Sequence, residues 1–130
     1  MRAFITAFCL VLATSAAQAG HRYRVSDYGE VVAHPAGCPW SLFCGCGAAE
    51  HILGHFVPQS SGLWLTTTWY RYPHLRNCER GAGAVWPGHV AAIESCEGNG
   101  IAILYDANSG GHLTRIHRAS LAGATIVRIR

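Results

Sequence analysis

The chain has 130 residues, of which 50% are hydrophobic and 13% charged, and its formal net charge is +3. All of its basic residues are arginine, and they are nearly balanced by acids, so the charge is too mild for a nucleic-acid-binding surface. No apolar stretch is long enough to span a bilayer.

The first nineteen residues have the pattern of a secretory signal peptide. Arg2 provides a positive start, residues 3–13 an apolar run, and Ala17-Gln18-Ala19 a cleavage site. We therefore expect residues 1–19 to be removed and the remaining chain, from Gly20, to be secreted or periplasmic. Removal takes one of the ten basic residues and leaves nine arginines against seven acids, a net charge of +2. This charge favours contact with an anionic wall polymer or membrane surface.

Residues 20–37 are polar and are expected to form an extended lead-in with a short strand near residues 30–33. The rest, 38–130, is expected to be one compact domain. The mature chain has an odd number of cysteines, which implies a leftover thiol or an intermolecular bridge. Two disulfides and one free thiol fit the number, and so do several buried, unpaired thiols. If Cys44 is free, the other four pair in one of three ways: Cys38, Cys46, Cys78 and Cys96.

A buried helix is predicted within residues 40–56. Ser41 is a candidate N-cap, Gly54 weakens the helix near its end, and Pro58 closes it. The apolar residues of one helix face are Ala48, Ala49, Ile52, Leu53 and Phe56.

Cys44 lies at or just before the start of this helix. Unpaired backbone N–H groups and the helix dipole favour an anion there, and for a thiol that means a larger thiolate fraction. Cys44 is therefore the candidate nucleophile, and such a nucleophile needs a base within hydrogen-bond reach.

Residues 63–72 have the composition of a strand but also helical spacing, so the pattern leaves both possibilities open. From residue 84 onwards the pattern is β. The expected strands are 84–86, 89–94, 101–105, 113–117 and 125–129. A helical half followed by a meander of strands predicts an α+β domain.

Eight histidines compete for the role of base. His51 and His55 point from the flank of the predicted helix, whereas the histidines in or near loops and edges are His74, His112 and His117. His89 differs because it begins a strand that continues with the apolar residues 90–93. This places its imidazole at the rim of the sheet.

The hairpin after His89 brings two polar residues beside it. If a four-residue loop, 97–100, joins Cys96 to Ile101, Asn108 lies opposite His89 and Asp106 lies opposite Ala91. All three polar side chains then face the same way. The alternative is that Asp106 and Asn108 only form the turn at Gly110-Gly111.

The order of these segments resembles the cysteine, histidine-dependent amidohydrolases/peptidases (CHAP family). The matching segments are the cysteine at a helix start, Gly83–Trp86, Gly88–Ser95 and Tyr105–Asn108. The resemblance covers residues 38 to about 130.

The resemblance implies a papain-like fold, in which residues 63–72 are helical. It also implies Cys44 as nucleophile, His89 as base, Asp106 at an acid position and Asn108 at the paired asparagine. An exported member would be a monomeric hydrolase of amide bonds in peptidoglycan, without a cofactor or metal.

Two other functions are compatible with the sequence. Zinc could bind Cys44, Cys46, His51 and His55, although a Cys-x-Cys pair is unusual for zinc and His51/His55 fit exposed helix positions equally. Alternatively, the chain is an inactive, disulfide-stapled module that binds the wall or a protein. Its aromatic surface would comprise Trp64, Trp69, Tyr70 and Tyr72, although such residues more often pack in a core.

Overall fold

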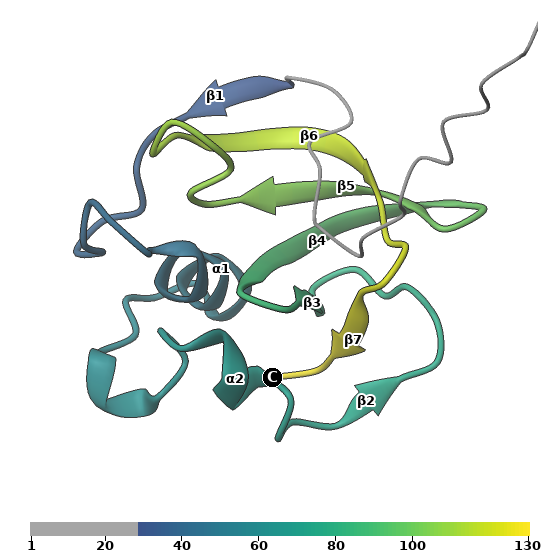
Figure 1. The fold of residues 1–130 in the computed structure, drawn as a ribbon, viewed down its shortest axis with the longest axis horizontal. Helices are drawn as coiled ribbons and strands as arrows, with labels where there is room; N and C mark the ends of the chain where they lie inside the picture. Colours follow the sequence, from purple (N-terminus) through teal and green to yellow (C-terminus); the bar gives the residue numbers. More distant parts are fainter. Residues whose placement is uncertain (1–28) are drawn as a thin grey trace, which may run out of the picture.

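The computed structural model describes residues 29–130 (Figure 1). The predicted signal peptide and the first part of the predicted lead-in, residues 20–28, lie outside the described residues. Within the described part, no helix has the length and apolarity needed to cross a membrane.

An antiparallel sheet is the centre of the fold. Across the sheet, the seven strands of the described residues follow the order β1-β6-β5-β4-β3-β7-β2, and each neighbouring pair is antiparallel. The strands are β1 (Glu30–Val32), β2 (His74–Leu75), β3 (Gly83–Trp86), β4 (His89–Gly98), β5 (Ile101–Asp106), β6 (Thr114–Ser120) and β7 (Thr125–Val127). The predicted lead-in strand is β1, whereas β2 corresponds to none of the predicted strands.

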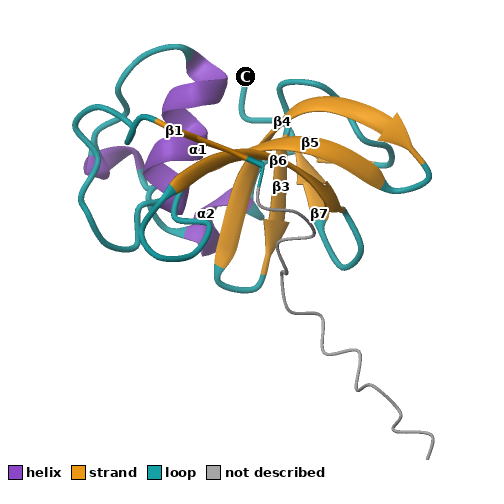
Figure 2. Cartoon of the chain, turned by 90° about the horizontal axis from the view of Figure 1, so that it is seen from above, coloured by secondary structure: helices purple, strands orange, loops and turns teal. Residues whose placement is uncertain are grey.

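The helices gather on one side of this sheet (Figures 1 and 2). They are α1 (Cys44–Leu53), the short 3₁₀ helix η1 (Gln59–Ser61) and α2 (Thr66–Trp69). The α+β class is therefore confirmed. Apolar side chains fill both faces of the sheet: one cluster joins α1 to Val90, Ala92 and Tyr105, and the other contains Trp86 and Leu104.

Helix α1 begins and ends at different residues from those predicted. Its N-cap is Phe43, without a side-chain hydrogen bond, so Ser41 is not the cap. It ends at Leu53 because Gly54 adopts a left-handed conformation (φ 78°) and donates its N–H to Glu50. Phe56, predicted on the buried face, lies beyond the helix and is 48% exposed.

The ambiguous segment 63–72 contains the four-residue helix α2 rather than a strand. Trp69, at its end, is completely buried, and its indole N–H donates to the Leu63 carbonyl. The indole packs so closely on Gly83 that a Cβ there would lie 2.5 Å from the ring. Tertiary packing of this one aromatic residue therefore outweighs the strand propensity of its neighbours.

The β4–β5 hairpin closes more tightly than predicted. Gly98 pairs with Ile101, so the loop contains only Asn99 and Gly100. Both have positive φ, at 54° and 72°, as a two-residue hairpin turn requires. The predicted four-residue loop, with Cys96 opposite Ile101, is wrong.

The register at the other end of the hairpin nevertheless agrees with the prediction. Two irregularities in residues 93–98 of β4 each shift the pairing by one residue. Ala92 therefore lies opposite Tyr105, and continuing this pairing by one residue places Asp106 opposite Ala91. The two bulges therefore offset the two-residue error in loop length before the strands reach His89.

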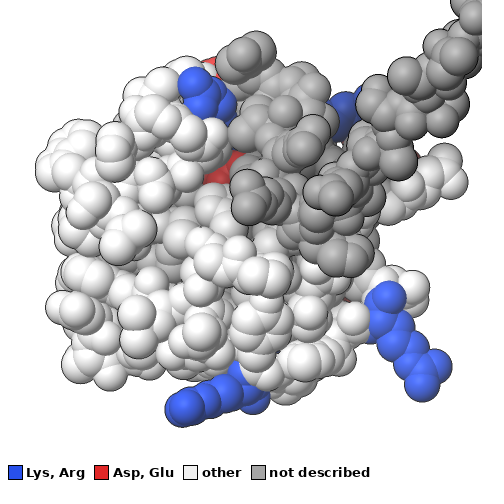
Figure 3. All heavy atoms as spheres, in the orientation of Figure 1, with Lys and Arg blue, Asp and Glu red and all other residues white. Residues whose placement is uncertain are grey.

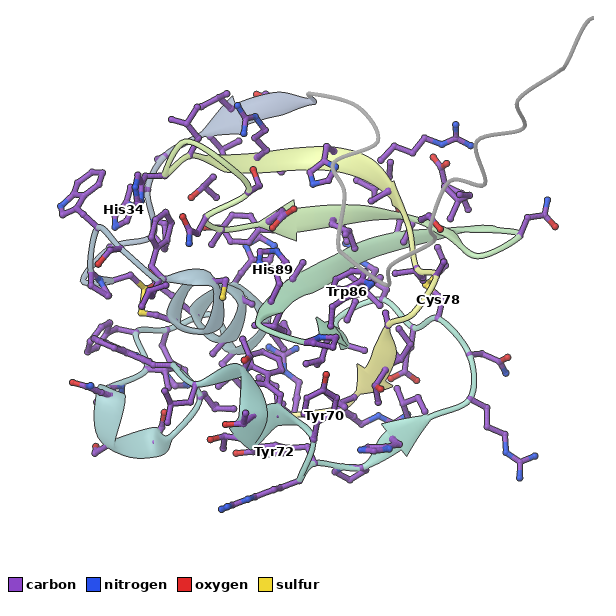
Figure 4. All side chains as sticks on the ribbon, viewed as in Figure 1. His34, Tyr70, Tyr72, Cys78, Trp86 and His89 are labelled. Carbon is purple, nitrogen blue, oxygen red and sulfur yellow. A yellow bond between two sulfur atoms is a disulfide. The ribbon has the colours of Figure 1, made fainter. Side chains whose placement is uncertain are left out.

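Two disulfides are present, Cys38–Cys46 and Cys78–Cys96, and Cys44 is the free cysteine among the described residues. The first bridge encloses Cys44 within its eight-residue separation, whereas Cys78 lies across the sheet from α1 (Figure 4). We therefore expect only the Cys38–Cys46 bridge to affect the position of Cys44.

We predict that removing the two bridges has separable effects. In the chain-entropy model each contributes about 2 to 3 kcal/mol to the free energy of unfolding, with somewhat more for the longer loop. The double variants C38A/C46A and C78A/C96A should both lose this amount in chemical denaturation. Only C38A/C46A should also change the rate at which iodoacetamide alkylates Cys44. Equal alkylation in the two variants would contradict a role of the first bridge in placing Cys44.

Candidate active site

Cys44 opens α1 and is 6% exposed. Three backbone N–H groups approach its sulfur: those of Val90, Gly45 and Cys44 itself. The contact with Val90 places the sulfur beside the His89–Val90 peptide, so α1 and β4 meet at the candidate nucleophile. Burial raises the pKa of the Cys44 thiol, and the three N–H groups only partly oppose it. The predicted gain in thiolate is therefore wrong for the resting protein, because desolvation outweighs the helix terminus.

The loop before Cys44 is tightly constrained. Leu42 adopts a φ of 50°, a left-handed conformation that costs a non-glycine residue about 1 to 2 kcal/mol. Trp40 stacks on His34 with 3.8 Å between ring centroids, and the His34 ring bonds to the Cys38 carbonyl (Figure 4). Together with the Cys38–Cys46 bridge, these contacts hold the strained loop in place.

Exposed apolar side chains lie around the start of α1. Trp40 is 71% exposed and Leu42 82%. The backbone of Leu63 and Trp64 passes so close to Gly45 that a Cβ there would clash with their carbonyl oxygens. Leu65, which follows, is 65% exposed. An apolar rim (Trp40, Leu42 and Leu65) therefore adjoins the segments that hold Cys44.

His89 is the first residue of β4 and lies next to α1 (Figure 4). Its Nε2 is 2.7 Å from Oδ1 of Asp106, and its side chain is 13% exposed. Burial, together with the positive charge of His117, lowers the pKa of His89 to about 4. At neutral pH His89 is therefore an uncharged imidazole, which donates from Nε2 to Asp106 and carries its lone pair on Nδ1.

Asp106 ends β5 and is completely buried. Its Oδ2 is 2.6 Å from Nε2 of His117, so each carboxylate oxygen contacts one imidazole. Burial raises the pKa of Asp106, whereas the hydrogen bond and charge of His117 and the charge of Arg115 act in the opposite direction.

His117 is the residue that the sequence analysis missed. We placed it at a strand end near loops, but β6 continues to Ser120 and the His117 side chain is fully buried. Asp106 lies opposite Arg115 in the β5–β6 ladder, so His117, two residues on, shares its face. The sequence signal that could have identified His117 is the polar residue at every second position, Arg115 and His117, which places both on one face of a strand.

Asn108 does not join this group by any contact found among the described residues. It adopts a φ of 59° in the turn after β5, where asparagine is one of the few residues that tolerate a left-handed conformation. Arg115 holds the same turn through three hydrogen bonds to Ser109 and Gly110. The turn-forming alternative therefore describes Asn108, and of the two predicted partners it is Asp106 whose side chain contacts His89.

The predicted zinc ligands are not brought together. Cys46 is bonded to Cys38, His51 stacks on Tyr105 and contacts Glu94, and His55 lies outside α1. Within the described residues, the cluster that could hold a metal contains Cys38, Cys46 and Glu50, and both of its sulfurs are in the disulfide.

The predicted aromatic surface is also divided. Trp69 belongs to the core, and the indole of Trp64 donates to the Val57 carbonyl. Tyr70 and Tyr72 are half-buried near α2 (Figure 4). The arginines stand apart from one another on the face in Figure 3 and form no single basic patch on it.

Comparison of the chain with models of known protein families, with curated proteins and with solved structures finds no match. A thiol and a neutral imidazole backed by a buried carboxylate are the groups needed for nucleophilic attack assisted by a base.

We predict that Cys44 is not part of an ion pair in the resting protein. Because its pKa is raised above the ordinary 9.0, less than about 1% is thiolate at pH 7. Its alkylation by iodoacetamide should rise steadily towards pH 9 and beyond. His89→Ala should leave the rate at pH 6–7 within about twofold. A plateau of reactivity between pH 5 and 8 that disappears in His89→Ala would contradict this, because it is the signature of a thiolate–imidazolium pair.

Proposed function

We propose that this protein is an exported thiol hydrolase that cleaves amide bonds, with Cys44 as nucleophile and His89 as base. The observation that carries the proposal is the placement of the free Cys44 sulfur at the His89–Val90 peptide, with His89 hydrogen-bonded to the buried Asp106. Each of the three side chains comes from a different element: α1, β4 and β5.

In the proposed mechanism the proton leaves Cys44 only when substrate is attacked. Nδ1 of neutral His89 takes the thiol proton as the sulfur bonds to the amide carbonyl carbon. The backbone N–H groups around the sulfur, including that of Cys44, stabilise the oxyanion. His89 then passes the proton to the leaving amine, and a thioester remains on Cys44. Water, deprotonated by His89, hydrolyses the thioester and restores the thiol.

Peptidoglycan is the proposed substrate, and the fold is proposed to be papain-like. Both follow from the resemblance of residues 38–130 to the CHAP family and from the predicted signal peptide. The arrangement of a cysteine at a helix start and a histidine at a strand start supports the papain-like assignment. The exposed apolar rim beside Cys44 offers contacts for substrate outside the scissile bond.

We predict that Cys44→Ala and His89→Ala each reduce the release of fragments from purified sacculi by at least about 1000-fold. Cys44→Ala should change the free energy of unfolding by only about 1 kcal/mol, because it removes one small side chain. His55→Ala, an exposed histidine one turn beyond His51, is the matched control and should retain full activity. Undiminished activity in Cys44→Ala would exclude the nucleophile assignment.

The second candidate is an inactive module of the same fold that binds the wall or a protein. The burial of Cys44 and the exposed Trp40 and Leu42 favour it, since a concealed thiol and an exposed apolar rim fit binding without turnover. In that case the wild-type protein and Cys44→Ala co-sediment equally with sacculi and neither releases fragments. Trp40→Ala should then weaken binding.

A further inference from the structure

Two hydrogen bonds determine where protons reside on His117. Its Nδ1 is 3.2 Å from the Arg118 carbonyl oxygen, which can only accept, so Nδ1 carries a hydrogen. Its Nε2 is 2.6 Å from Oδ2 of Asp106. One further proton therefore lies between Nε2 and Oδ2. Whether it is assigned to the imidazole or to the carboxyl, the Asp106–His117 pair has no net charge.

This neutral pair is what His89 contacts through Oδ1 of Asp106. A bare carboxylate at this distance would favour the protonated form of His89, because opposite charges attract strongly in a buried site. A neutral pair does not, and burial then keeps His89 uncharged. Among the described residues, the other charged group acting on Asp106 is Arg115, whose positive charge lowers the pKa of Asp106 as that of His117 does. Cys44, beside the His89–Val90 peptide, is a neutral thiol because burial raises its pKa.

We propose that His117 is a positioning residue of the site, which holds Asp106 and cancels its charge so that His89 meets Cys44 as a neutral imidazole. The role in turnover rests on the proposed function. His117 itself touches no reacting group: it acts through Asp106. The proposed site therefore has three side chains linked by hydrogen bonds, His89, Asp106 and His117, and Cys44 beside the His89–Val90 peptide. These residues come from β4, β5, β6 and α1.

The test is the titration of His89 in the His117→Gln variant. The glutamine side chain would retain a donor for Oδ2 but carries no charge, so the full negative charge of Asp106 would act on His89. In ¹⁵N NMR the pKa of His89 should rise from about 4 to above the ordinary 6.5, at least about a 300-fold change in the acid dissociation constant. Alkylation of Cys44 should gain a plateau at neutral pH. Unchanged titration of His89 and unchanged alkylation would overturn the proposal.

Two controls separate charge from structure. In the Asp106→Asn background the charge is absent, so adding His117→Gln should leave the pKa of His89 unchanged; a rise there of the same size would assign the effect to altered packing and overturn the proposal. His74→Gln, at an exposed histidine of β2, should leave the titration as in the wild type.

A measurement on the wild-type protein keeps the proposal testable if His117→Gln does not fold. Imidazole ¹⁵N spectra between pH 5 and 8 should show His117 with a protonated Nδ1. An unprotonated Nδ1, with the hydrogen only on Nε2, would give the pair a full negative charge and overturn the proposal. These spectra require no turnover. If Cys44→Ala still digested sacculi, the proposed function would fail while the charge state of His117 could be established independently.

Discussion

The rest of the site depends on the burial of one carboxyl group, that of Asp106. Burying such a group without partners costs several kcal/mol, so its oxygens must be satisfied within the protein. Here one oxygen contacts His89 of β4 and the other His117 of β6. Three adjacent strands are therefore tied together at the point where the candidate base lies, and a slip of either ladder by one residue would turn a partner to the opposite face.

The candidate nucleophile, Cys44, is held by a separate set of contacts. The Cys38–Cys46 bridge, the His34–Trp40 stack and the close passage of residues 63–64 over Gly45 constrain the start of α1. None of these contacts involves the Asp106 group. The two halves meet where the Val90 N–H points at the Cys44 sulfur, and this peptide directly follows the candidate base. Packing of α1 on β4 thus brings the candidate nucleophile to the strand that begins with the candidate base.

Part of this arrangement could be predicted from local patterns in the sequence. Hydrophobic periodicity gave α1 and most strands, and hairpin alternation placed Asp106 on the face of His89. The predicted length of the β4–β5 loop was wrong, yet two bulges in β4 restored the predicted pairing near His89. Bulges depend on sheet twist and on neighbouring strands, and the sequence of a single hairpin does not encode these. His117 was missed because its partner lies on β5 across a long turn, and because the predicted strand ended at His117, whereas β6 continues to Ser120. The disulfide pairing could not be predicted, because cysteine spacing alone permits three pairings of the four cysteines other than Cys44.

The electrostatics of the site reverse the simplest expectation for a cysteine at a helix start. There the backbone N–H groups favour a thiolate, but they act on a sulfur that is almost removed from water, and desolvation is the larger effect. Burial also lowers the pKa of His89 and so keeps its imidazole uncharged at neutral pH. Because both partners are neutral, moving the thiol proton to the imidazole creates two charges in a dry site. Such a transfer becomes favourable only as negative charge passes to a substrate oxygen that nearby N–H groups can stabilise. In the proposed mechanism, this arrangement keeps the Cys44 thiol unreactive towards oxidants until an acyl group lies against it.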